Sequence, residues 1–252
     1  MRSTFFQQPL EHQIEVEGEN WNQGEVLNGK LRIRNMSTQS VTVKTVQIIL
    51  AYSLKKSIRE KTDLAWEIQE KKVLTQNISL SSKEEETFKW SIKLKSDCPI
   101  SDKLGSLFLL FGDTNVLSIG GRLDLKINLH PLLQNFLQTF TTQFRFLEKH
   151  QKRKSDWTEI KLIPPESREF PNVESVSCLL RIHDEKLEAI YKFKMQGLGR
   201  SGQQMKVTKK NRTIEQTINK ENYLQPGGFP NRSYFRDKIN EALNIARPEV
   251  MF

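Results

Sequence analysis

The 252-residue sequence contains only two cysteines, Cys98 and Cys178. A chain of this length can fold without a disulfide, and isolated thiols are typical of a reducing compartment. We therefore expect two unpaired, half-buried cysteines in a protein of the cytoplasm or of the inner membrane face. No run of about 18 apolar residues occurs, so we expect no membrane-spanning helix. Residues 1–8 lack the apolar segment of a secretory signal.

The sequence also lacks the residue patterns of common catalytic and metal sites. The four histidines are scattered, and neither a Gly-x-Ser-x-Gly motif nor an Asp-x-Asp-x-Asp loop occurs. Residues 197–202 spell Gly-x-Gly-x-x-Gly. The alternating residues before them indicate an antiparallel strand rather than the parallel unit of a dinucleotide site, so we expect a flexible glycine loop. We predict no catalytic residue, no metal, no cofactor and no enzymatic activity.

Two-residue alternation of apolar and polar side chains dominates the first half. Phe88, Trp90, Ile92 and Leu94 alternate with polar residues, which predicts a strand with one buried side and one side in water. The longest such segment is 41–54, which is rich in β-branched residues. Further strands are expected at 14–16, 24–34, 66–80, 107–111 and 123–129.

The predicted strand at 24–34 allows two more detailed expectations. Val26, Leu31 and Ile33 are expected to share its buried side. Gly29 interrupts the pattern, and a glycine within a strand is typical of a β-bulge. We therefore expect a bulge at this residue.

The apolar period changes after residue 130. Pro131 suits a first helical turn, and apolar residues then recur every three or four positions as far as Leu147. This spacing predicts an amphipathic helix of roughly four to five turns, which we expect to close one end of a sandwich and to join two domains. Ser233 is expected to cap a short final helix. Strands are expected at 157–163, 173–182 and 187–195, and another one begins at 205.

These elements predict an all-β fold with two antiparallel β-sandwich domains joined by the amphipathic helix. Residues 1–129 would form the N-terminal sandwich. Residues 130–252 would contain the linking helix, a smaller C-terminal sandwich and the short terminal helix. No internal repeat is visible in the sequence, although both halves follow the same strand-rich plan.

Charge is distributed unevenly between the halves. Residues 1–128 carry 18 Lys and Arg against 16 Asp and Glu, whereas residues 129–252 carry 21 against 14. The balances of +2 and +7 add up to the net charge of +9. A basic second half favours an anionic partner, although a solvated surface has the same composition.

Two basic clusters are the strongest functional signal. The first follows the predicted helix, where its charge could instead stabilise the helix C-terminus. No aromatic residue lies within either cluster, so nucleic acid is not the expected partner. The candidate contact residues are Lys152, Arg153, Lys154, Lys209, Lys210 and Arg212.

The order of several segments resembles the arrestin-like family and, within it, the bacterial sporulation-control proteins. The segments that carry this resemblance are 21–31, 46–50, 88–94 with 98–101, 121–126, 131–134 and 195–200. The resemblance implies two β-sandwiches that act as a non-catalytic adaptor, and the sporulation branch is implicated in the control of development and cell-envelope events. No ligand residue of the family maps onto this chain.

We therefore expect a cytoplasmic adaptor or scaffold that binds protein partners through its sheet edges and its basic second domain. The alternative is a peripheral protein that binds anionic membrane surfaces through the two clusters. A sugar-binding sandwich or an enzyme is less well supported, and would need an exposed aromatic row formed by Trp21, Trp66 or Trp157.

Overall fold

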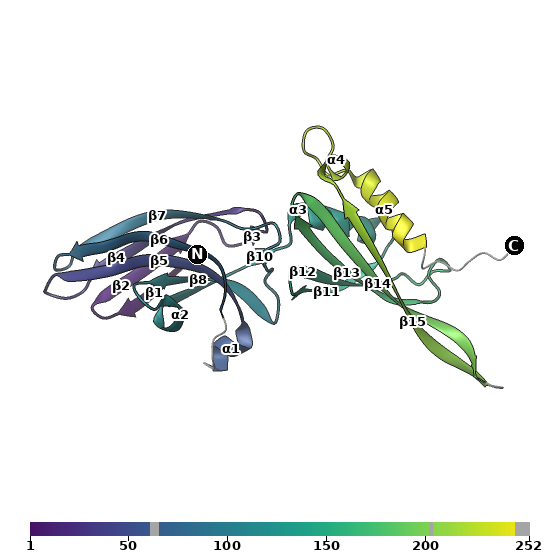
Figure 1. Ribbon diagram of the computed structural model, residues 1–252, viewed down its shortest axis with the longest axis horizontal. Coiled ribbons are helices and arrows are strands. Elements are labelled where there is room, and N and C mark those ends of the chain that lie inside the picture. The colour runs from purple at the N-terminus through teal and green to yellow at the C-terminus, as the bar shows by residue number, and fades with distance from the viewer. Residues whose placement is uncertain (61–65, 202–203, 245–252) are drawn as a thin grey trace. The chain divides into compact units, whose positions relative to one another are not determined.

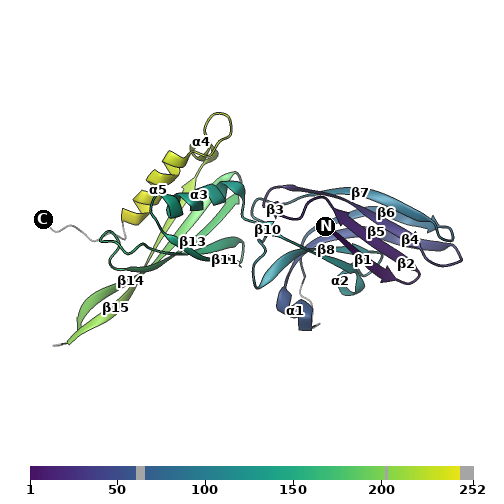
Figure 2. The same cartoon turned by 180° about the vertical axis from the view of Figure 1, so that it is seen from behind.

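The computed structural model describes residues 1–60, 66–201 and 204–244, except the side chains of 60, 197–201 and 204–208. The chain forms two compact units, Met1–Asn128 and Leu129–Phe252. Antiparallel strands make up most of both units (Figures 1 and 2). The expected all-β class is confirmed. Within the described residues, no helix is both long and apolar enough to cross a membrane.

The first unit contains two four-stranded sheets. One sheet has the order β1-β2-β4-β7 and the other β6-β5-β8-β9, while β3 and β10 form a short parallel pair. The strands are β1 (Arg2–Gln7), β2 (Leu10–Val16), β3 (Trp21–Asn22), β4 (Val26–Asn35), β5 (Val41–Leu54), β6 (Glu67–Leu80), β7 (Glu85–Lys93), β8 (Gly105–Gly112), β9 (Gly121–Leu125) and β10 (Ile127–Asn128). Two short helices, α1 (Lys55–Glu60) and α2 (Val116–Ile119), follow β5 and β8.

Alternating side chains of both sheets form the core of this unit. Trp90 and Ile92 of β7 are buried, as their alternation predicted, and Leu94 just after the strand joins them. The segment 41–54 is one continuous strand, β5, with the predicted bounds. The inner side of β5 packs in this core, while Ile49 and Ala51 on its outer side pack with Phe108 in a smaller cluster.

Both detailed expectations for β4 need correction. Val26 is exposed, because it lies five residues before Leu31, an odd number that places it on the opposite side of the strand. Leu27 is the residue that is buried together with Leu31 and Ile33. No bulge occurs at Gly29, which is paired in register on both sides. A Cβ at Gly29 would lie 2.2 Å from the Glu15 carbonyl oxygen on β2 and 2.5 Å from the Trp90 ring on β7. The glycine therefore makes room for both the backbone of β2 and the tryptophan, and close packing rather than a bulge explains it.

The second unit contains one five-stranded antiparallel sheet in the order β11-β12-β13-β14-β15. Its strands are β11 (Leu147–Lys154), β12 (Trp157–Ile163), β13 (Val173–His183), β14 (Lys186–Ser201) and β15 (Gln204–Ile218). Its helices are α3 (Pro131–Thr142), α4 (Lys220–Tyr223) and α5 (Arg232–Asn244). The turn between β13 and β14 is the expected one, with Asp184 and Glu185 in the left-handed conformation typical of a two-residue hairpin.

Helices α3 and α5 form the layer that packs on this sheet, where we expected a second sheet (Figure 2). Phe136 and Phe140 of α3 and Phe235 of α5 are buried among the strand residues Tyr191 and Phe193. The helix expected to join two domains therefore belongs to the core of the second unit. The spacing of apolar residues every three or four positions correctly predicted the buried face of α3. It gave no information on which sheet that face covers.

Helix α3 is shorter than expected. It ends at Thr142, and Arg145 adopts a left-handed conformation while the Phe146 amide donates to the carbonyl of Phe140. Leu147, the last apolar residue of the predicted helix, is exposed and begins β11. The basic cluster at 149–154 thus lies in a strand and does not stabilise a helix C-terminus.

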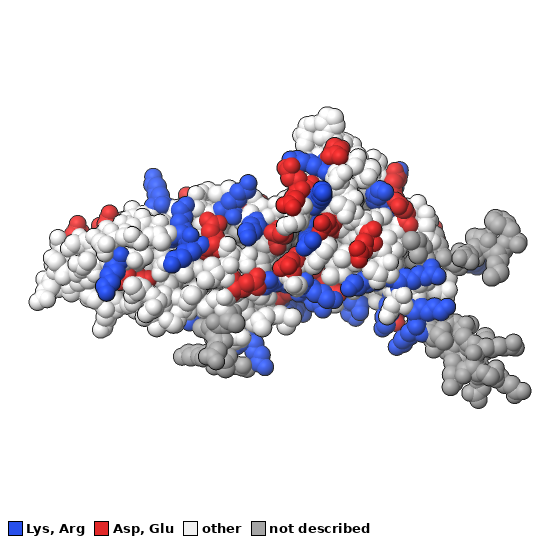
Figure 3. Space-filling model, in the orientation of Figure 1, with Lys and Arg blue, Asp and Glu red and all other residues white. Residues whose placement is uncertain are grey.

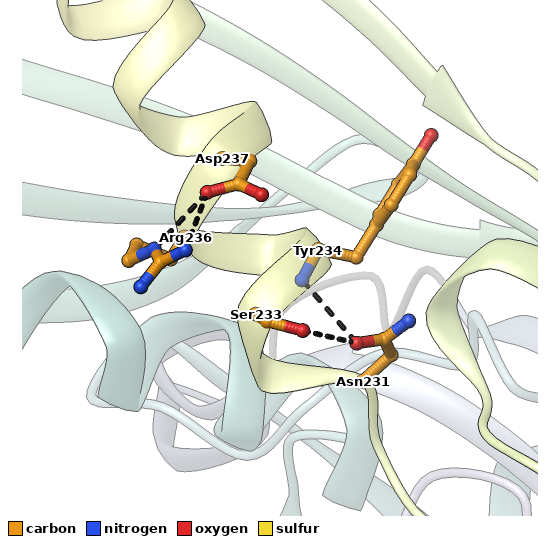
Figure 4. Close-up of polar contacts among 5 residues, drawn as sticks. All are labelled: Asn231, Ser233, Tyr234, Arg236 and Asp237. Atoms are coloured by element: carbon orange, nitrogen blue, oxygen red, sulfur yellow. Dashed lines mark hydrogen bonds and ion pairs between the residues drawn. The ribbon is translucent and has the colours of Figure 1, made fainter.

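Two other local expectations are also corrected. Residues as far as Ser201 continue β14, and Gly197 and Gly199 are paired with β15, so the expected glycine loop is a strand where it is described. Helix α5 is capped by Asn231, whose side-chain oxygen accepts hydrogen bonds from the backbone amide of Tyr234 and from the hydroxyl of Ser233 (Figure 4). Ser233 lies inside the helix as a partner of the cap.

Candidate functional site

The two predicted basic clusters lie on opposite edges of the five-stranded sheet. The first is on β11 and the second on β15, with three strands between them. Since neighbouring strands are about 4.8 Å apart, the two edges are separated by roughly 19 Å. The structure therefore presents two separate basic edges rather than one patch.

Strand alternation also divides each cluster between the two faces of the sheet. The register places Lys152, Lys154 and Lys209 on the helix-free face, which we define as the face opposite α3 and α5. The other three candidates alternate with these, and their side chains are directed to the helix-covered side at the sheet edges. They are Arg153, Lys210 and Arg212.

A buried carboxylate uses the charge of two of the candidates. Glu159 on β12 is only 6% exposed, and its two oxygens lie 2.9 Å from the Lys152 Nζ and 3.1 Å from the Lys154 Nζ. Burial raises the pKa of Glu159, but the hydrogen bonds from the two lysines outweigh this effect, so that the net pKa is lowered. Lys152 and Lys154 therefore help to hold β11 on β12.

A second set of contacts occupies the same end of the helix-free face. The Arg181 guanidinium lies 4.2 Å from the centre of the Trp157 ring and forms an ion pair with Glu188 on the adjacent strand. The Arg181 side chain therefore covers part of the Trp157 ring, which is partly buried. Each cation named at this end of the face is therefore paired with a carboxylate.

The next row across the sheet carries charge that is not neutralised. Register aligns His150, Lys161, Ser177, Lys192 and Thr213 on five adjacent strands. Lys161 and Lys192 form no ion pair with any residue in the described part of the chain. They are two strand spacings, about 10 Å, apart. Figure 3 shows acidic and basic side chains interspersed over this sheet, with basic ones gathered where β14 and β15 project from it.

Sequence reasoning did not select Lys161 and Lys192, because neither belongs to a run of basic residues. The signal was nevertheless present: alternation in 187–195 places Lys192 with Ile190, opposite Tyr191 and Phe193, and the structure has this arrangement. The pairing of β12 with β13 and β14, which brings Lys161 beside Lys192, could not be deduced from alternation alone.

The tryptophans do not form the exposed row that a sugar-binding face would need. Trp21 and Trp90 are buried in the first unit. Trp66 is partly buried against Phe108, and its indole nitrogen donates to the carbonyl of Leu117. Trp157 alone lies in the second unit, under Arg181.

No group of three or more His, Cys, Asp or Glu residues able to hold a metal occurs among the described residues. Cys98 and Cys178 are free and fully buried, rather than half-buried as expected. Burial raises the pKa of Cys98 to about 12 and that of Cys178 still further. Both are therefore held as unreactive thiols in the cores of their units.

The described strands form several sheets that are antiparallel apart from the short pair of β3 and β10, and none of these sheets closes into a barrel, which defines an all-β fold. The structure is similar to that of Spo0M, the sporulation control protein of Bacillus subtilis, with a TM-score of 0.64 and 12% identity over 94% of this chain and 99% of that chain. At this identity the likeness shows the fold alone. No family model matches the sequence, and no curated protein matches it.

Weaker likenesses cover only half of the chain. A β-glucosidase of Listeria innocua matches 48% of this chain and 16% of its own, with 14% identity and a TM-score of 0.30. The alkylpurine DNA glycosylase AlkC of Pseudomonas fluorescens matches 47% of this chain and 30% of its own, with 14% identity and a TM-score of 0.27. Neither likeness carries an argument about fold or function.

Proposed function

We propose that this protein is a non-catalytic adaptor whose second unit docks an acidic, extended segment of a protein partner. The single observation that carries the proposal is the coincidence of un-neutralised Lys161 and Lys192 on the helix-free face with a long edge strand, β15. The likeness to Spo0M, which is named a sporulation control protein, supports a regulatory role of the same general kind. The proposed location of this adaptor is the cytoplasm.

The edge strand offers the backbone part of such a docking site. Among the described strands, β15 is bonded only to β14, and its exposed residues include Lys209, Lys210 and Arg212. A partner strand added along this edge would satisfy its outward backbone donors and acceptors without requiring a particular sequence. Acidic side chains on that strand would meet Lys209, Lys210 and Arg212 at the edge. The acidic segment that continues from the strand would cross the helix-free face to Lys192 and Lys161, which gives the site selectivity for charge.

Binding to an anionic membrane surface through the two clusters is the weaker alternative. Lys152 and Lys154 are already paired with Glu159, and the clusters lie on opposite edges. A flat membrane favours cations that share one face and remain unpaired. The six candidate residues do not meet this condition as a set.

The test is photo-crosslinking in the native cell. A photoreactive residue at Asn211 on β15 is expected to capture an acidic partner that the same residue at Asn28, exposed on β4 in the first unit, does not capture. The charge-reversed variant K161E/K192E should lose this adduct, while K30E/K89E, which reverses two exposed lysines of the first unit, should retain it. Identical proteins captured at both positions, or an adduct indifferent to K161E/K192E, would overturn the proposal.

A further inference from the structure

A second cationic feature lies in the first unit, away from any residue that the sequence singled out. Leu54 at the end of β5 is paired with Gly105 at the start of β8. Antiparallel register therefore brings α1, which follows Leu54, beside the loop that precedes Gly105 (Figure 1). A pocket of about 260 Å³ lies between them, and its described lining consists of Lys55, Lys56, Arg59, Lys103 and Leu104.

The walls of this pocket are held in place by hydrogen bonds. The Asp102 carboxylate accepts from the backbone amides of Leu104 at 2.7 Å and Gly105 at 2.8 Å, which fixes the loop. The Lys55 Nζ donates to the Asp102 carbonyl at 2.9 Å, and the Lys55 amide donates to the Leu104 carbonyl at 2.8 Å. Helix α1 and the loop are thus joined directly to each other.

The charge of the pocket is positive throughout its described lining. Four of the five lining residues are lysine or arginine, and none of the five is acidic. Arg59 and Lys103 form no ion pair with any residue that the structure describes. Like charges at this spacing repel one another, whereas an anion between them would remove the repulsion.

We infer that this pocket binds a phosphate-bearing anion. A phosphate group has several acceptor oxygens that can bridge lysines and the fork of an arginine. The volume is at the small end of ligand pockets, which suits a phosphate or diphosphate group rather than a larger molecule. No aromatic ring belongs to the described lining, so the pocket offers no stacking surface for a nucleic-acid base.

Two exposed leucines beside the pocket bear on whether the phosphate belongs to a lipid head group or to a soluble compound. Leu104 is 60% exposed and belongs to the lining, and Leu54, which is 49% exposed, directly precedes Lys55 in the chain. Apolar side chains beside a basic pocket suit the head group of an anionic lipid, where they can enter the acyl region. A soluble phosphate compound would use the same cations and would not need the leucines.

The first experiment measures binding of pyrophosphate to the full chain by calorimetry at fixed salt. R59Q/K103Q is expected to bind at least tenfold more weakly than the unchanged protein, because two charge-assisted contacts are lost. The matched control K30Q/K89Q removes the same charge from paired strand positions in this unit and should bind within twofold of the unchanged protein. Hydrogen exchange of the first unit should be the same in all three proteins.

The second experiment identifies the source with phosphatidylcholine vesicles that do or do not contain phosphatidic acid. Recruitment that needs phosphatidic acid and is lost in L104S, with pyrophosphate binding unchanged, assigns the pocket to a lipid head group. Pyrophosphate binding without recruitment to either vesicle assigns it to a soluble phosphate compound. No saturable pyrophosphate binding, or equal weakening in R59Q/K103Q and K30Q/K89Q, would overturn the inference.

Discussion

The two units build their cores from similar alternating strands but close them with different layers. In the first unit two sheets supply a mainly aliphatic core, whereas in the second unit helices α3 and α5 cover one sheet and aromatic rings fill the space between. Alternation along a strand determines which side is buried, and it does not determine whether a sheet or a helix buries it. The comparison therefore shows where strand periodicity stops being informative.

The units also differ in how they treat buried polar groups. His12 in the first unit is fully buried, and neither of its ring nitrogens has a hydrogen-bond partner among the described residues. Glu159 in the second unit is buried as well, but two lysines neutralise it. We expect the first unit to lose stability in mild acid, where protonation of His12 in the unfolded chain favours unfolding. The second unit should lose stability only in stronger acid, where Glu159 becomes protonated and its pairing with the lysines is lost.

The largest expected effect tests the aromatic core of the second unit. Phe140 is 1% exposed and its ring lies against Phe136, Phe146 and Tyr191. F140A should lower the free energy of unfolding of this unit by about 3–5 kcal/mol, because the cavity cannot be refilled without moving several rings. Hydrogen exchange should accelerate in the second unit and stay unchanged in the first.

The control for this prediction is F229A, which removes the same side chain from an exposed position in the same unit. It should change the free energy of unfolding by less than about 0.5 kcal/mol. Equal effects of the two substitutions would show that the aromatic cluster is not what stabilises the helical layer.

The second prediction concerns acid and the first unit. Burial lowers the pKa of His12 from 6.5 to about 4, against a smaller opposing effect of Asp113. The unfolded chain therefore binds a proton at His12 more readily than the folded chain does, and stability falls as the pH drops from 6.5 towards 4. At about 1.36 kcal/mol per pKa unit, the loss between pH 7 and pH 4 is about 3 kcal/mol.

The measurement compares urea unfolding at pH 7 and pH 4, followed by the fluorescence of the buried tryptophans of the first unit. In H12L the stability difference between these two pH values should shrink by about 3 kcal/mol. The exposed His183 provides the control H183L, which should keep the original difference. An unchanged pH dependence in H12L would contradict the assignment to His12.

Much of the fold was predictable because strand alternation and helical period are local. The bounds of β5, the buried side of β7 and the apolar face of α3 all follow from the spacing of residues. The supposed bulge at Gly29 arose because Trp90, which packs on Gly29, comes from a strand about 60 residues later. The error at Val26 was local, since the alternation itself places Val26 on the side opposite Leu31. Long-range packing of this kind leaves no local pattern.

The candidate sites depend even more on pairing between distant strands. Runs of basic residues were visible, but the sheet order separated them onto opposite edges. Lys161 and Lys192, and likewise Arg59 and Lys103, are unremarkable in the sequence and become neighbours only through the register of β12 to β14 and of β5 with β8. A single sequence therefore indicates the charge of a unit better than the place where it gathers.

The third prediction tests the paired carboxylate of the second unit. E159Q should lower the free energy of unfolding at pH 7 by about 1–2 kcal/mol, at the low end for charged hydrogen bonds because the two lysine side chains are 41% and 49% exposed. Since the pKa of Glu159 is lowered in the folded state, its contribution is present above pH 4.5 and is lost as the pH falls through the folded pKa.

Unfolding curves of E159Q and the unchanged protein should accordingly converge in strong acid. E148Q, an exposed glutamate on β11, is the matched control and should have no measurable effect at either pH. A constant difference between E159Q and the unchanged protein at all pH values would show that packing rather than charge is responsible.

The smallest expected effect separates two candidates for the cap of α5. Asn231 accepts the hydrogen bonds that the start of this helix offers, whereas the Ser233 hydroxyl donates to Asn231, and the nearby Arg236 and Asp237 pair only with each other in Figure 4. N231A should cost about 1 kcal/mol of unfolding free energy, while S233A should cost only a few tenths, because the backbone amide of Tyr234 keeps its acceptor. Thermal unfolding combined with hydrogen exchange of α5 measures both. A larger loss of unfolding free energy in S233A than in N231A would instead identify Ser233 as the cap, as the sequence predicted. Helix α5, part of the helical layer that most distinguishes the second unit from the first, would then begin where the sequence predicted.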